Sequence, residues 1–143
     1  MVAGPIGAVI AQLSVHAAVQ DGARPVVTLP GLLQAVVLAP VLEELVFRGG
    51  LQGLLERSRR ARTEWLPGIS AGNVLTSVAF ALTHLMVTST WMALATFVPS
   101  LVFGRLKQLY EPRLVPAMSM HAWYNLCFLA AACAWGANFQ RGF

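Results

Sequence analysis

A group of charged residues inside an apolar stretch limits what this chain can fold into. Residues 39–50 read APVLEELVFRGG, so Glu43, Glu44 and Arg48 stand among apolar and small residues. Each such charge costs roughly 2.5–3.5 kcal/mol at the centre of a membrane helix. Glu44 and Arg48 are four residues apart, so on a helix they share one face and can pair. Glu43 has no equally good partner in its own helix, which indicates either a functional group or part of a structural ion-pair cluster.

The composition favours a bilayer over water as the surroundings of this chain. Of its 143 residues 57% are hydrophobic and 11% are charged, whereas a soluble domain carries about 25% charged residues. The length predicts one domain over residues 1–143,. The formal net charge of +4 comes from basic residues gathered in short connections. There they act as topology signals, so nucleic acid is not an expected partner.

The apolar runs predict an all-α, polytopic transmembrane bundle of about five helices. We place them near residues 4–20, 30–56, 69–87, 91–109 and 115–135, with Ser70 or Asn73 as a cap of the third. Pro40 is expected to bend the second helix. Basic residues follow the second and fourth helices, which predicts a cytoplasmic N-terminus,. His16 stands alone in the first helix and is interpreted as a packing residue.

Polar groups on three of these helices form a candidate active site. Besides the acidic cluster they are His84, His121 and Asn125, the last two being four residues apart on one helix face,. A carboxylate and a histidine can hold and deprotonate a water molecule, while a histidine and an asparagine can donate hydrogen bonds to an oxyanion. Amide hydrolysis needs both functions. The hydroxyls of Ser77, Thr83 and Ser119 show no sign of activation as nucleophiles,.

The order and spacing of these motifs resemble a known family. Glu43-Glu44-x-x-x-Arg48, Phe80-x-x-x-His84 and His121-x-x-x-Asn125 resemble the three motifs of the CPBP family of intramembrane proteases, also called Abi or type II CAAX prenyl endopeptidase-like. The resemblance covers about Pro40 to Asn125, and it implies an all-helical transmembrane core. It implies that Glu43 and His84 activate the water, that His121 and Asn125 form the oxyanion pocket, and that Glu44 and Arg48 orient the site. The chain has fewer helices than many members, which bears on substrate choice more than on chemistry.

The sequence therefore predicts an intramembrane endopeptidase that cuts near a membrane-embedded or lipid-attached tail, with no cofactor. The expected partners are a membrane-associated peptide or protein substrate and the lipid bilayer. A zinc protease is the first alternative, with Glu43, His84 and His121 as ligands and a water in the fourth position. The second alternative is a non-catalytic scaffold, an immunity protein or a proton-coupled transporter that uses the same buried groups.

Overall fold

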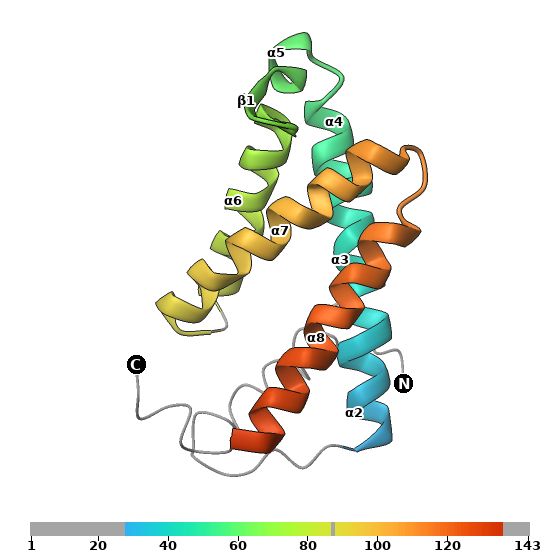
Figure 1. The fold of residues 1–143 in the computed structure, drawn as a ribbon, viewed down its shortest axis with the longest axis vertical. Helices are drawn as coiled ribbons and strands as arrows, with labels where there is room; N and C mark the ends of the chain where they lie inside the picture. The colour runs from blue at the N-terminus through green and yellow to red at the C-terminus, as the bar shows by residue number, and fades with distance from the viewer. Residues whose placement is uncertain (1–27, 87, 136–143) are drawn as a thin grey trace. The chain divides into compact units, whose positions relative to one another are not determined.

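The computed structural model describes residues 28–86 and 88–135 of the chain, and Figure 1 shows their fold. The chain divides into two compact units, one of residues 41–121 and one that combines residues 1–40 with residues 122–143. The predicted helix over residues 4–20, with His16, lies outside the described residues.

The charged stretch lies in an uninterrupted helical run, Leu29–Leu55, close to the predicted residues 30–56. The Thr28 hydroxyl caps its start by accepting a hydrogen bond from the Gly31 amide at 3.3 Å,. Pro40 removes one hydrogen bond of an α-helix, and the run departs from α geometry on both sides of it. Its segments are α2 (Leu29–Leu33), the π-helix η1 (Gln34–Leu38), α3 (Ala39–Glu44), the π-helix η2 (Leu45–Gln52) and α4 (Gly53–Leu55).

The connection after this run has more structure than the expected polar loop. It forms α5 (Arg59–Arg62) and an antiparallel hairpin of β1 (Glu64–Leu66) and β2 (Ile69–Ser70). Gly68 closes the hairpin with a φ of 74°, a left-handed conformation that glycine adopts without strain,. The mostly helical fold confirms the predicted class, and this short hairpin is an addition to it.

The remaining helices agree with the predicted positions. α6 (Ala71–Leu85) begins two residues later than predicted because residues 69–70 pair in the hairpin, and Ser70 caps it by accepting from the Asn73 amide at 3.0 Å. α7 (Thr90–Tyr110) and α8 (Val115–Trp135) match the predicted residues 91–109 and 115–135 within one residue at each end.

Within the unit of residues 41–121, α6 and α7 pack along each other and both contact η2 (Figure 1). The helices approach closely at Gly104 of α7, where an added Cβ would collide with the Asn73 side chain of α6. Asn73 Nδ2 uses this space to donate a hydrogen bond to the Leu101 carbonyl at 3.0 Å. A glycine and an amide thus fix how these two helices meet.

Many buried side chains are polar and many exposed side chains are apolar, which is the reverse of the usual distribution in a soluble protein. The fully buried side chains include Glu44, Arg48, Gln52, Asn73, Ser77 and Ser100, while Leu33, Val46, Leu54, Leu82 and Val98 are exposed. Extended exposed apolar surface of this kind marks contact with a membrane or a partner. Apolar residues outside and paired polar residues inside therefore suit a protein surrounded by lipid.

One helix of the described part, Leu29–Leu55, is long and apolar enough to cross a membrane. α6 has 15 residues, about 22 Å of helix, which is shorter than the hydrocarbon layer of about 30 Å. α7 carries Arg105 and Lys107 close to its end. The predicted bundle of five spanning helices accordingly stays a proposal.

Candidate active site

From Glu44 to Glu56, just past the end of the helical run, every fourth residue is polar and buried. Glu44, Arg48 and Gln52 are 0% exposed and Glu56 is 6% exposed. A regular α-helix has 3.6 residues per turn. Glu56, twelve residues after Glu44, would therefore be rotated by about 120° around the helix axis and would point away from Glu44. The turns of η2 are wider than those of an α-helix,. They keep these side chains on one face.

The ion pair predicted from the i,i+4 spacing is confirmed. Arg48 Nε lies 3.3 Å from Glu44 Oε2, with both side chains fully buried. Arg48 Nη2 also donates to Ser100 of α7, to the carbonyl at 2.8 Å and to the hydroxyl at 2.7 Å. The guanidinium carbon lies 5.2 Å from the Phe80 ring centroid and 5.6 Å from that of Phe103. These aromatic faces stabilise the buried cation.

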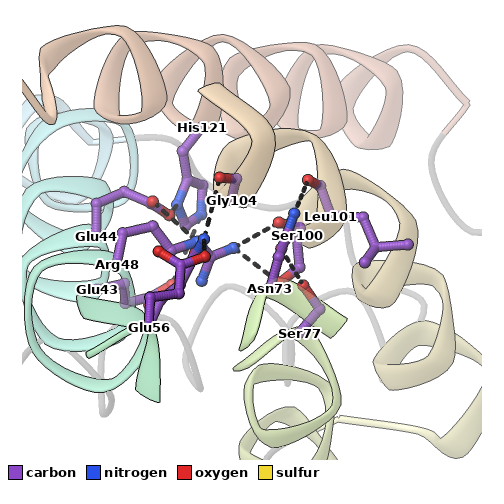
Figure 2. Close-up of polar contacts among 11 residues, drawn as sticks. Glu43, Glu44, Arg48, Glu56, Asn73, Ser77, Ser100, Leu101, Gly104 and His121 are labelled. Carbon is purple, nitrogen blue, oxygen red and sulfur yellow. Dashed lines mark hydrogen bonds and ion pairs between the residues drawn. The ribbon is translucent and has the colours of Figure 1, made fainter. Parts of the chain in front are cut away.

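His121, near the start of α8, lies between the two adjacent carboxylates (Figure 2). Its Nδ1 is 2.9 Å from Glu44 Oε1, and its Nε2 is 3.6 Å from Glu43 Oε2. The ring stacks on Phe103, with 4.6 Å between centroids and 15° between planes. The structure therefore brings Glu43, Glu44, Arg48 and His121 together, whereas the bond between His121 and Glu44 was not expected from the sequence.

The two carboxylates of the cluster are engaged differently. Glu44 Oε1 lies 2.9 Å from His121 Nδ1 and its Oε2 lies 3.3 Å from Arg48 Nε. The 3.6 Å between His121 Nε2 and Glu43 Oε2 is longer than a hydrogen bond,. Within the described residues Glu43 Oε2 is buried without a hydrogen bond, although the side chain keeps 21% exposure. Glu43 thus has an acceptor oxygen to which no described group donates a hydrogen bond.

Phe80 joins His84 to the cluster. Its ring centroid lies 4.4 Å from that of His84 and 5.8 Å from that of His121. His84 Nδ1 is 2.9 Å from the Phe80 carbonyl, which can only accept a hydrogen bond. Nδ1 therefore carries the proton, and a neutral His84 has its lone pair on Nε2.

Asn125 belongs to the other unit, residues 1–40 with 122–143. Its Nδ2 donates to the Ala35 carbonyl of η1 at 2.8 Å. A primary amide has a second N–H to donate. Its predicted part in an oxyanion pocket stays a prediction.

Two hydroxyls considered from the sequence as nucleophiles, Ser77 and Thr83, lie on α6 and are engaged elsewhere. Ser77 Oγ donates to Asn73 Oδ1 at 3.2 Å, and Thr83 Oγ1 donates to the Phe80 carbonyl at 2.7 Å. Neither contact is with a base, which a hydroxyl nucleophile needs for activation. These contacts do not set up either hydroxyl as a nucleophile.

A second buried network surrounds Glu56. Its Oε2 pairs with Lys107 Nζ at 2.6 Å, and its Oε1 accepts hydrogen bonds from Gln52, Ser70 and Gln108. Burial alone would raise the pKa of Glu56, but these hydrogen bonds and the Lys107 charge hold the pKa below its ordinary value. The network ties the end of the helical run to α7 and to the cap of α6.

Comparison with known proteins identifies the family. A family model described as type II CAAX prenyl endopeptidase, Rce1-like, matches residues 25–127. The chain belongs to this family. The match covers Glu43 through Asn125, so all three motifs of the predicted site lie within it. No curated protein and no solved structure matches the chain. Membership in the Rce1-like family indicates a protease of the CAAX type and a membrane setting.

The zinc alternative for this Rce1-like chain requires Glu43, His84 and His121 to converge on one point. Within residues 28–86 and 88–135, no three His, Cys, Asp or Glu side chains are placed to hold a metal ion. His121 Nδ1 lies 2.9 Å from Glu44 Oε1, and its Nε2 lies 3.6 Å from Glu43 Oε2. The zinc site stays an alternative proposal.

Several buried polar residues of the Rce1-like chain were not identified from the sequence. They are Gln52, Glu56, Asn73, Ser100 and Lys107. The four-residue spacing that continues from Arg48 to Gln52 and Glu56 was a visible signal for two of them. Asn73 and Ser100 bond to main-chain carbonyls or side chains of a neighbouring helix. No spacing in the sequence reveals such partners.

Proposed function

We propose that this chain is an intramembrane endopeptidase that hydrolyses a peptide bond close to a membrane-embedded or lipid-attached tail. The observation that carries the proposal is the buried group of Glu43, Glu44, Arg48 and His121, set among outward-facing apolar side chains. An arrangement of two carboxylates with different surroundings suits acid–base chemistry. The family match supports the same class of reaction.

In the proposed mechanism Glu43 is the general base. Its Oε2, which accepts no hydrogen bond within the described residues, accepts a proton from water while His84 Nε2 helps to hold that water,. The resulting hydroxide attacks the carbonyl carbon of the scissile bond. Glu43, now protonated, then gives its proton to the departing nitrogen, so that the C–N bond breaks and the carboxylate is restored.

The oxyanion of the tetrahedral intermediate is assigned to donors on α8. His121 is proposed as the first donor, through an Nε2–H on the side of Glu43. Asn125 is proposed as the second donor on the strength of its motif. Such donors act only as charge develops on the carbonyl oxygen, which is how they lower the barrier.

Glu44 and Arg48 are proposed to orient the site. Glu44 holds His121 by Nδ1, while Arg48 holds Glu44 and binds α7 through Ser100. These contacts fix the imidazole ring relative to Glu43. Neither residue needs to touch the substrate in this account.

The proposed setting is the cytoplasmic membrane of a prokaryote, with five membrane helices and the N-terminus inside. The candidate span Leu29–Leu55 and the basic residues that follow it support this orientation,. A non-catalytic scaffold, an immunity protein or a transporter would share the buried charges but would not cleave.

A cleavage assay separates these classes. The full-length protein is reconstituted in vesicles with two probes, a peptide ending in a farnesylated Cys-aliphatic-aliphatic-X tail and the same peptide on an apolar membrane anchor. Mass spectrometry is expected to show one new peptide terminus in at least one probe, with chelator leaving the rate unchanged. Intact probes would contradict the endopeptidase. Loss of activity with chelator, restored by zinc, would contradict the metal-free mechanism.

A further inference from the structure

Three arginine side chains that follow the helical run have no partner within the described residues. Arg57, Arg59 and Arg60 are exposed and make no hydrogen bond or ion pair through their guanidinium groups. The nearby carboxylate of Glu64 accepts instead from the Gly68 amide at 3.1 Å. Unpaired positive charge is thus concentrated on one short segment, residues 57–66, which we call the basic segment.

The same segment exposes apolar side chains. Trp65 is 59% exposed and Leu66 is 51% exposed, both on β1. Tryptophan is enriched where a membrane meets water, since one end of its ring system is apolar and the other can hydrogen-bond. A surface that combines free guanidinium groups with tryptophan and leucine matches the polar and apolar parts of a lipid headgroup region.

The basic segment is held in a fixed position. Arg62 Nε donates to the Glu56 carbonyl at the end of the helical run. The Thr63 carbonyl accepts from the Ala71 amide at 2.8 Å, at the start of α6. The segment starts two residues after the candidate span Leu29–Leu55. A polybasic stretch at this place lies at headgroup depth.

We propose that the basic segment is a binding site for the phosphate groups of anionic lipids. Arg57, Arg59 and Arg60 would bind headgroup phosphates through paired N–H donors, with Trp65 and Leu66 entering the apolar edge of the layer. The inference rests on the membrane setting of the proposed function. Lipid binding by this segment differs from a topology signal, which acts during insertion and does not require lipid selectivity in the folded protein.

Native mass spectrometry of the full-length protein, offered equal amounts of phosphatidylglycerol and phosphatidylcholine in detergent, tests this site. Wild type is expected to retain phosphatidylglycerol preferentially. Each arginine near an anionic surface contributes about 1 kcal/mol, or about fivefold. Arg59→Gln should therefore lower the preference about fivefold, and the triple Arg57→Gln/Arg59→Gln/Arg60→Gln variant should abolish it. The matched control Arg113→Gln removes an exposed arginine of another connection and should leave it unchanged.

The outcomes separate the possible sources of phosphate. A triple lysine variant should keep most of the preference because the charge is retained. No preference in wild type, or an unchanged preference in the triple glutamine variant, overturns the site. Displacement of the lipid by an equal concentration of inorganic phosphate or of an RNA oligonucleotide overturns the lipid as the ligand. The same measurements on Glu43→Gln should match wild type, so failure of the proposed hydrolysis leaves this test intact.

Discussion

Glu43 and Glu44 are adjacent in sequence but have different surroundings. Glu44 is fully buried and holds both Arg48 and His121. Glu43 is partly exposed, and one of its oxygens has no hydrogen bond within the described part of the chain. A carboxylate already engaged by Arg48 and His121 suits an orienting role, whereas one with an oxygen that accepts no hydrogen bond suits a base. Their environments thus argue for two roles.

Replacing Glu44 should damage the fold as well as the chemistry. Glu44→Gln leaves the buried Arg48 guanidinium without its counter-ion, a loss of roughly 3–5 kcal/mol for breaking a buried pair. We expect lower yield and a lower Tm together with reduced activity, measured by thermal unfolding in detergent and by cleavage. Wild-type stability and activity in this variant would count against the ion pair.

Asn125 tests whether the proposed oxyanion pocket exists. Removing one such donor typically lowers kcat by about 10²–10³, so Asn125→Ala should show that loss with a nearly unchanged KM. Asn125→Asp should be worse at neutral pH, because an ionised carboxylate repels the oxyanion. Kinetics of both variants on one reconstituted substrate provide the measurement. A raised KM with unchanged kcat would make Asn125 a binding residue.

At the scale of elements, the meeting of α6 and α7 depends on the absence of a side chain at one position. Gly104→Ala would bring a Cβ into the space of the Asn73 side chain. The Asn73 side chain would have to move and lose its bond to Leu101. We expect a loss of roughly 1–3 kcal/mol in the free energy of unfolding, as for other overpacked sites.

Two variants control this experiment. Gly53→Ala places its Cβ 3.6 Å from the Arg48 carbonyl, an ordinary contact, so it should be neutral or slightly stabilising. Asn73→Ala in the Gly104→Ala background removes the clash, so the two losses should not add. Additive losses would show that Gly104 acts through something other than Asn73.

The Glu56 network should make stability depend on pH. The pKa of Glu56 is lowered in the folded chain, so its contribution is full above the ordinary pKa of 4.5 and is lost as the pH falls through the folded pKa,. Glu56→Gln should lower the free energy of unfolding by roughly 1.5–3 kcal/mol at neutral pH and by less in acid. The exposed Glu111→Gln is the control, with little effect expected,. Equal losses for Glu56→Gln at neutral and acid pH would contradict the network.

At the scale of the whole molecule, local patterns predicted the helices and tertiary contacts decided the rest. The apolar runs located α6, α7 and α8 closely because helix length and hydrophobicity are properties of the segment itself,. The i,i+4 rule likewise predicted the pair of Glu44 and Arg48,.

The features that the sequence did not predict arise from contacts between distant segments and from departures from α geometry. The wide turns of η2 have no compositional signature, yet they align Glu56 with Glu44. The bond between Glu44 and His121 joins residues 77 positions apart. The helical propensity of each segment does not predict such a bond, because the bond depends on how the helices pack.

Glu43 is proposed as the base that activates water, and one substitution tests this role. Cleavage of the farnesylated and membrane-anchored probes is compared for wild type, Glu43→Gln and the exposed-site control Glu111→Gln, all reconstituted in the same vesicles. The amide keeps the size of the carboxylate but cannot take a proton from water. We predict no cleavage by Glu43→Gln with a wild-type Tm, and full cleavage by Glu111→Gln. Turnover by Glu43→Gln comparable to wild type would contradict the account.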